Sequence, residues 1–136
     1  MADDKLSTHN SALSTGRKKG PIYEKSFAFA VRIVKLTRYL QEEKKEFVLS
    51  KQVLRSGTAI GALVREAEHA ESKTDFAHKM NIALKEANET LYWLELLLQS
   101  EYITEQSFKS IQTDSEVLVK LLVSIVKTTR ENIRTK

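Results

Sequence analysis

After Gly61 the chain continues for 75 residues to Lys136 without one glycine or proline. Its only proline is Pro21, and its four glycines all lie at or before position 61. Inside a helix glycine costs about 1 kcal/mol and proline about 3 kcal/mol relative to alanine, so both residues tend to interrupt helices. A stretch this long without them, rich in Leu, Glu, Lys and Ala, predicts helices joined by very short turns.

The composition is that of a single globular domain. The chain has 136 residues, of which 41% are hydrophobic and 29% charged, enough to bury one core. It contains no cysteine, which excludes a disulfide scaffold and indicates a reducing compartment, so we expect a cytoplasmic protein. No apolar run approaches the roughly 18 residues of a membrane span. Residues 1–20 lack the apolar stretch of a secretory signal and predict a disordered tail ending in Arg17, Lys18, Lys19 and Gly20.

Four amphipathic segments fill the rest of the chain. The expected helices span about 22–46, 50–70, 72–100 and 104–134. Pro21 suits the first helical position, and the charged run 42–46 is expected to be a frayed end or a loop. The expected N-caps are Ser50, Ser72 (with Asp75 in a capping box) and Thr104. Long helices with short connections favour an all-α, up-down-up-down antiparallel four-helix bundle over 21–136.

Two of these helices carry more apolar residues than one buried face needs. The third has Leu, Tyr and Trp around most of its circumference over 91–98, and the fourth has Val, Leu and Ile over 117–126. A helix that is apolar on all sides must be covered by other protein. The simplest cover is another copy of the chain, so we expect a homo-oligomer. The alternative is a wide core that leaves a few aliphatic side chains exposed.

Gly57 and Gly61 lie four residues apart on one face of the second expected helix. Because each costs helix propensity, the pair predicts a close approach by another helix backbone. A phosphate-binding loop is the other interpretation. It is excluded because mid-helix amides are already hydrogen-bonded and the GxxxxGK[ST] pattern is absent.

Two carboxylate–histidine pairs at i, i+3 flank the turn between the second and third helices. They are Glu66 with His69 and Asp75 with His78. Ferritin-like bundles bind two metals through such pairs on two different helices, with one further Glu from each of the other two. Here both pairs flank one turn and the middle of the first helix has no carboxylate, so we predict no metal and no cofactor.

Charged residues in the middle of the third helix indicate ion pairs. Glu86 lies beside the core position Ala87, so we expect it to be partly buried and paired with a cation such as Arg55. Lys85 and Glu89 are expected to pair at i, i+4. No nucleophile, histidine or glycine-rich loop accompanies these carboxylates, so we predict a structural role and no enzymatic activity.

Basic residues give the main indication of function. The net charge is +4, and from Val117 onward the only acidic residue is Glu131. Cations recur along the first and fourth helices, and we expect them to bind RNA or DNA phosphates with little sequence specificity. The alternative is an ordinary solvated helix face, with cations near a helix C-terminus matching its dipole. The candidate residues are Arg32, Lys35, Arg38, Lys120, Lys127, Arg130 and Arg134.

Three segments also resemble a known family. They are LSKQVLRSGTAIGA with REA (49–62 and 65–67), SKTDF (72–76) and IALKEANETLYWL (82–94). Their order and spacing resemble the bacterial four-helix bundle proteins that are encoded in intervening sequences of 23S rRNA genes. The resemblance covers roughly residues 26–103, and the fourth helix only by its pattern.

The resemblance implies assembly as a homopentameric ring. It also implies kinship with the accessory protein of diversity-generating retroelements, which is thought to engage nucleic acid and a reverse transcriptase. It supplies no catalytic residues, and the tail fits no part of it. Residues in its motif, with an implied structural role, are Arg55, Gly57, Gly61, Glu66, Glu86 and Tyr92.

The sequence therefore predicts a non-enzymatic homo-oligomer, by the resemblance a pentamer, that binds RNA or DNA and no membrane. The alternatives are a protein assembly scaffold without nucleic acid and a di-metal bundle.

Overall fold

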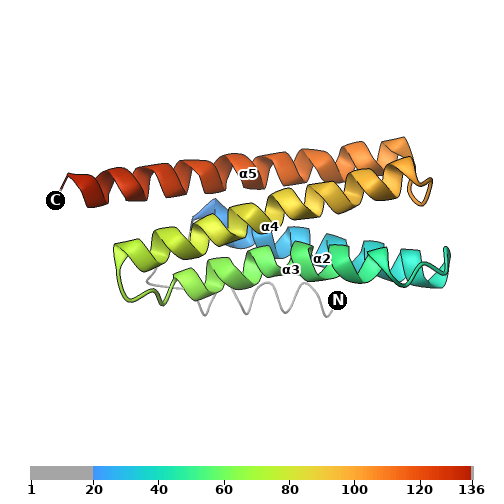
Figure 1. Cartoon of the computed structure of the whole chain (residues 1–136), viewed down its shortest axis with the longest axis horizontal. Helices are drawn as coiled ribbons and strands as arrows, with labels where there is room; N and C mark the ends of the chain where they lie inside the picture. The colour runs from blue at the N-terminus through green and yellow to red at the C-terminus, as the bar shows by residue number, and fades with distance from the viewer. Residues whose placement is uncertain (1–19, 136) are drawn as a thin grey trace, which may run out of the picture.

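The computed structural model describes residues 20–135, which form four helices (Figure 1). With the labels of Figure 1 they are α2 (Pro21–Glu42), α3 (Leu49–Ala67), α4 (Lys73–Gln99) and α5 (Glu105–Arg134). Successive helices run in opposite directions and the described residues contain no strand, so the predicted all-α four-helix bundle is confirmed. The predicted tail, with its basic cluster 17–19, lies outside the described residues except for Gly20.

Each helix packs along its length against the next one in the chain, whereas α2 and α5 contact each other over a much shorter stretch. The last turns of α5 extend beyond the α3–α4 turn (Figure 1). Side chains from all four helices meet in one core, including Phe29, Ile33, Ile60, Leu94, Leu118 and Leu122.

Two of the three predicted N-caps are confirmed. Ser72 Oγ accepts from the backbone N–H of Asp75 at 3.0 Å, and Thr104 Oγ1 accepts from that of Ser107 at 3.1 Å. The Asp75 carboxylate accepts in return from the N–H of Glu71, at 3.2 Å. Pro21 is the first residue of α2, where its missing N–H costs nothing.

The predicted cap at Ser50 is wrong, because Glu46 takes that role. The Glu46 carboxylate accepts from the N–H groups of Val48 at 3.1 Å, Leu49 at 2.9 Å and Ser50 at 2.7 Å. The Ser50 hydroxyl instead donates to the Glu46 carbonyl at 2.9 Å. Glu46 is buried, and Lys45 before it has a positive φ of 53°. The first helix therefore ends at Glu42 and not at about residue 46. Residues 43–48 form a loop, which is one of the two alternatives that we expected for the charged run 42–46.

The two helical glycines lie at the crossing of α2 and α3. A Cβ at Gly57 would come within 2.8 Å of Cγ1 of Ile33, and one at Gly61 within 3.4 Å of the Ser26 carbonyl oxygen. Close packing against a neighbouring helix is therefore the role of this pair, as the sequence predicts.

The largest row of exposed apolar side chains lies on α2, where the sequence did not predict one, while the fourth helix, α5, also exposes Val117 (38%) and Val123 (47%). On α4 the leucines of 91–98 are buried or half-buried in the bundle, and Tyr92 is the exposed large apolar residue. On α2, by contrast, Phe27, Val31 and Val34 follow each other at helical spacing with 48%, 39% and 40% of their surfaces exposed. Across residues 20–135 no helix combines the length and apolar character needed to cross a lipid bilayer.

Candidate nucleic-acid interface

A basic groove runs between α4 and the C-terminal part of α5. Lys127, Arg130 and Arg134 line it from α5, and Asn81 and Leu84 line it from α4. Val123 and Val126 of α5 complete the wall of this open groove, whose volume is about 330 Å³. The i, i+3 and i+7 spacing of the three cations places them along one side of α5.

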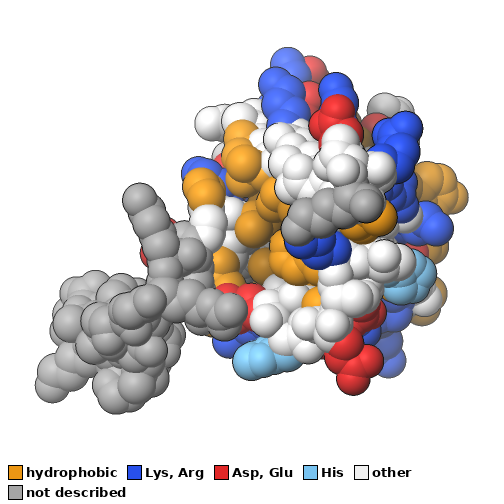
Figure 2. All heavy atoms as spheres, turned by 90° about the vertical axis from the view of Figure 1, so that its left-hand side faces the viewer, with side chains coloured by type: hydrophobic (Ala, Val, Ile, Leu, Met, Phe, Trp, Pro, Cys, Tyr) orange, Lys and Arg blue, Asp and Glu red, His pale blue; other side chains and the backbone are white. Residues whose placement is uncertain are grey.

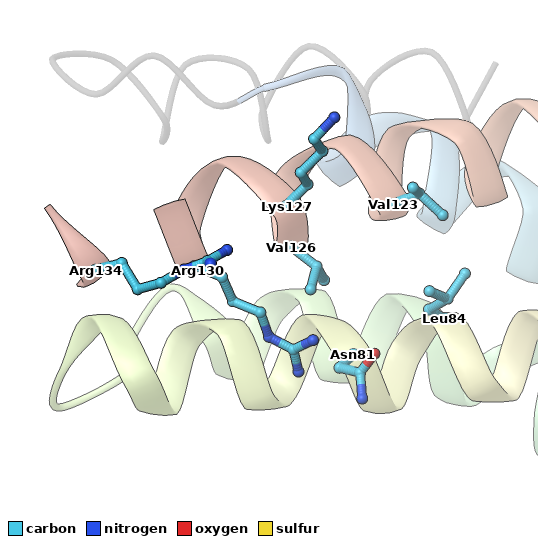
Figure 3. A pocket seen from close by; sticks show the side chains of 7 residues that line it. All are labelled: Asn81, Leu84, Val123, Val126, Lys127, Arg130 and Arg134. Atoms are coloured by element: carbon cyan, nitrogen blue, oxygen red, sulfur yellow. The ribbon is translucent and has the colours of Figure 1, made fainter. Parts of the chain in front are cut away.

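The side chains of these cations point in different directions (Figure 3). The Arg130 side chain extends from α5 toward α4 and Asn81, whereas the ammonium group of Lys127 points away from α4. Leu84 and Val126 lie between the two helices. A guanidinium over this groove, beside the Asn81 amide, can donate to two oxygens of one phosphate.

The positive charge of this groove is not neutralised within the described chain. None of Lys120, Lys127, Arg130 and Arg134 forms an ion pair with another residue of 20–135, and all four are exposed. Lys120 lies about two turns before Lys127, nearer the middle of α5 and outside the groove lining. Cations without an internal partner are available to an external anion.

Arg32 is different, because it joins α2 to α5. Its guanidinium contacts Asp114 Oδ2 at 2.8 Å and donates to the Ser110 hydroxyl at 2.6 Å. These contacts join α2 to α5, which otherwise pack against each other over only a short stretch. Arg32 therefore supports the fold and is not an unpaired surface cation.

Lys35 and Arg38 are exposed but lie far along the bundle from the groove. The helices α2 and α5 are antiparallel, with Arg32 beside Asp114 and with Ile22 and Ile125 lining one cavity. Lys35 and Arg38 therefore lie toward the α2–α3 turn, whereas the groove lies at the opposite end. The structure does not bring the seven predicted cations together on one surface.

The predicted ion pair of Arg55 joins α3 to α4. Arg55 contacts Glu86 Oε2 at 3.3 Å and also bonds to Glu89, which accepts from Trp93 Nε1 at 3.0 Å. The Trp93 N–H and then Arg55 lower the pKa of Glu89 against the opposing effect of burial, while Glu89 and Glu86 raise the pKa of Arg55. Glu89 therefore pairs with Arg55 instead of the expected Lys85.

The remaining motif residues are structural neighbours of this network or of the α3–α4 turn. Tyr92 is 58% exposed, and its ring meets that of Trp93 edge-on with centroids 5.0 Å apart. Glu66 bonds to Lys79 at 3.3 Å. Among residues 20–135 no three His, Cys, Asp or Glu side chains gather as a metal site would require, so Glu66, His69, Asp75 and His78 form no such cluster.

Sequence reasoning missed the α4 side of the groove and one aromatic contact. Asn81 and Leu84 carry no charge pattern, and only the pairing of α4 with α5 places them beside the cations. The guanidinium of Arg65 lies over two rings of α2, 4.9 Å from the Tyr23 centroid and 5.0 Å from that of Phe27. The antiparallel hairpin of α2 and α3 was the signal that could have indicated this contact.

The fold and the groove together define a small helical-bundle protein with a basic groove between two of its helices. A family model described as 23S rRNA-intervening sequence protein matches residues 18–124, so the chain belongs to that family. Lys127, Arg130 and Arg134 lie beyond the matched residues.

One solved structure is similar over most of its length. It is the 1.70 Å crystal structure of a protein with unknown function from the S23 ribosomal protein family of Bacteroides thetaiotaomicron VPI-5482. The two chains are 61% identical, the TM-score is 0.77, and the similarity covers 78% of this chain and 98% of the other. The comparison with curated proteins gave no match.

Proposed function

We propose that this protein is a self-assembling, non-enzymatic bundle that binds the phosphate backbone of RNA or DNA through the groove between α4 and α5. The observation that carries the proposal is the set of three groove cations without an ion pair inside residues 20–135. Each phosphate that such a cation neutralises releases counterions, which favours binding at low salt.

Little sequence specificity follows from the chemistry of the groove. Phosphate contacts fix the position of a nucleic acid but carry no base information. Apart from the cations, Asn81 is the lining side chain that can hydrogen-bond to a base edge. The other lining residues, Leu84, Val123 and Val126, are apolar and cannot form such bonds.

Self-association is supported by the exposed stripe of α2, which we define as Phe27, Val31 and Val34. A row of apolar residues on one helix face is typical of a surface covered by another protein. A second copy would cover it and also multiply the number of grooves that one nucleic acid can meet. The family resemblance favours five copies in a ring.

The absence of an enzymatic role is supported by the bonding of the two mid-helix carboxylates. Within the described residues Glu86 and Glu89 are engaged by Arg55, and Glu89 also by Trp93, so neither is poised as a general base. The cysteine-free sequence supports the cytoplasm as the place of action.

Salt-titrated binding to a structured RNA tests the proposal. We expect binding at low salt, with a slope of log K against log salt that falls by up to about 0.9 for each phosphate contact removed by Lys127→Glu or Arg130→Glu. The matched control is Lys51→Glu, which reverses one exposed charge at the start of α3, at the opposite end of the bundle from the groove. Equal losses in the control and groove variants, or no binding at low salt, would contradict the proposal.

The same α2 stripe favours a second candidate, an assembly scaffold whose partner is a different protein. Capture of a defined protein partner that survives nuclease treatment, together with wild-type RNA affinity of Arg130→Glu, would favour this candidate.

A further inference from the structure

Tyr92 is an exposed aromatic side chain on the same side of α4 as the basic groove. It follows Asn81, Lys85 and Asn88 at a spacing of four, three and four residues, which places all four along one side of the helix. Asn81 lines the groove, and Tyr92 lies about 16 Å further along α4 at 1.5 Å per residue. Because Tyr92 is 58% exposed, its ring can be reached from solvent.

Unpaired cations continue from the groove toward Tyr92. Figure 2 views the bundle from the end where α5 terminates and shows Lys and Arg side chains along its upper edge, on the side of α5. Because α4 and α5 are antiparallel, the direction from Lys127 to Lys120 is also the direction from Asn81 to Tyr92. Lys120 and Lys85 are exposed and form no ion pair within residues 20–135. A strand that leaves the groove on this side therefore meets further positive charge.

The ring of Tyr92 is held in position by its neighbours. It meets the ring of Trp93 edge-on, with centroids 5.0 Å apart. The Trp93 N–H donates to Glu89 at 3.0 Å, and Glu89 is bonded in turn to Arg55 of α3. An aromatic side chain that is already positioned loses little conformational freedom when a ligand binds.

Carboxylates around Tyr92 favour an uncharged group over a phosphate at the ring. Glu89 and Glu95 lie about one turn before and after it on α4, and Glu95 has no ion pair among residues 20–135. Glu116 of α5 adds an exposed carboxylate about one turn beyond Lys120. A phosphate at this place would be repelled, whereas a neutral base stacks on an aromatic ring.

We propose that the protein binds single-stranded nucleic acid, with phosphates in the groove and along Lys85 and Lys120, and with an unpaired base stacked on the ring of Tyr92. Stacking on an aromatic ring is tolerant of base identity, in keeping with little sequence specificity. A duplex keeps its base faces within its own stack, whereas the loops of a structured RNA present them. This inference rests on the proposed nucleic-acid binding and names the form of nucleic acid that binds.

Three RNA probes of equal length test the inference at low salt: a uridine single strand, a strand with the same backbone but no bases, and a duplex. We expect Tyr92→Ala to weaken binding of the uridine strand about fivefold or more, and to leave the affinities for the other two probes unchanged. Tyr92→Phe, which keeps the ring, should bind as wild type does. The matched control is Tyr39→Ala, which removes a tyrosine of α2 that is 41% exposed and should change no affinity.

A photo-cross-link gives a second measurement that does not depend on affinity. A single strand carrying 5-iodouridine should cross-link to Tyr92 and not to Tyr39 on irradiation, because the reaction needs a base in contact with the ring. Circular dichroism checks that each variant keeps its helices.

Equal affinities of wild type and Tyr92→Ala for the uridine strand, or equal losses for all three probes, would overturn the inference. The proposed function would survive either result if Arg130→Glu still weakened binding of the strand without bases. If no probe binds at low salt, the proposed function and this inference both fail.

Discussion

At the scale of single residues, Glu46 does most to shape the α2–α3 turn. Burial raises the pKa of its carboxyl group, but the N–H groups of Leu49, Ser50 and Val48 stabilise the ionised form more, so the pKa is lowered overall. The ionised carboxylate therefore replaces the hydroxyl cap that usually begins a helix. A loop glutamate that caps from outside the helix has no recognisable spacing rule, which is why the sequence favoured Ser50.

Replacing Glu46 with Gln should destabilise the protein by about 1–3 kcal/mol near neutral pH, because one neutral oxygen cannot replace a carboxylate bound to three N–H groups. The measurement is urea unfolding. Since the folded-state pKa is lowered, this stabilisation is complete above the ordinary glutamate pKa and is lost as pH falls through the folded-state value. The difference between wild type and variant should therefore shrink in acid. Glu43→Gln, an exposed change in the same loop, is the control expected to stay within about 0.5 kcal/mol.

Glu101, at the α4–α5 turn, is a second residue whose backbone conformation has a measurable cost. Its φ is 66°, and the N–H of Tyr102 after it bonds to the Leu97 carbonyl at 2.9 Å, as in a helix ending that prefers glycine. Glu101→Gly should stabilise the protein by about 0.5–1 kcal/mol. Gln99→Gly, inside the last turn of α4, should instead destabilise it by about 1 kcal/mol. Thermal unfolding of both variants decides the matter, and a loss of stability in Glu101→Gly would contradict this explanation.

At the scale of helices, the closeness of α2 to α3 depends on where each glycine lies. Gly57 faces the side chain of Ile33, which is fully buried and branched at Cβ, whereas Gly61 faces the Ser26 backbone at ordinary contact distance. Position 57 therefore has no room for a methyl group, whereas a methyl group at position 61 would be in ordinary van der Waals contact with Ser26.

We expect Gly57→Ala to destabilise the bundle by about 1–3 kcal/mol through overpacking against Ile33, despite its gain in helix propensity. Gly61→Ala should be neutral or stabilising by up to about 1 kcal/mol. Chemical denaturation of both variants gives the comparison. If Gly57→Ala were as stable as Gly61→Ala, the glycines would not mark the close contact.

Helix number, order and most ends could be predicted, because periodicity, Pro21 and the caps at Ser72 and Thr104 act locally. The exposed apolar stripe on α2 could not be predicted. The third helix is apolar nearly all round, but α3 and α5 pack against it and half-bury its leucines. The α2 helix packs fully against α3 alone, so its ordinary-looking stripe stays exposed.

The basic site was predictable in part for the same reason. The spacing of Lys127, Arg130 and Arg134 already places them on one side of a helix. The ion-pair partner of Arg32 depends on which helix packs opposite it, and the spacing of cations along the sequence does not predict that helix. Asp114 therefore changes the role of Arg32 from a surface cation to a bridge between helices.

At the scale of the whole molecule, the bundle has two distinct candidate surfaces: the stripe on α2 and the groove between α4 and α5. The stripe and groove lie on different helices, so a copy that covers the stripe can leave the groove open. We therefore expect that the proposed assembly and the proposed nucleic-acid binding can be disrupted by separate substitutions.

Val31→Asp should reduce the solution mass of the assembly, because a charge in the middle of the stripe cannot be buried without a partner. Asn88→Asp adds the same charge on the exposed face of α4 and should leave the mass unchanged. Sedimentation velocity compares the two. Equal masses for wild type and both variants would show that the stripe is not the assembly surface.

The most direct test of assembly with nucleic-acid binding is the solution mass by light scattering, with and without a structured RNA. The account predicts a multiple of 15.5 kDa at micromolar concentration, and a further rise with RNA that is lost at high salt and reduced by Arg130→Glu. A single 15.5 kDa particle whose mass does not change with RNA would contradict it.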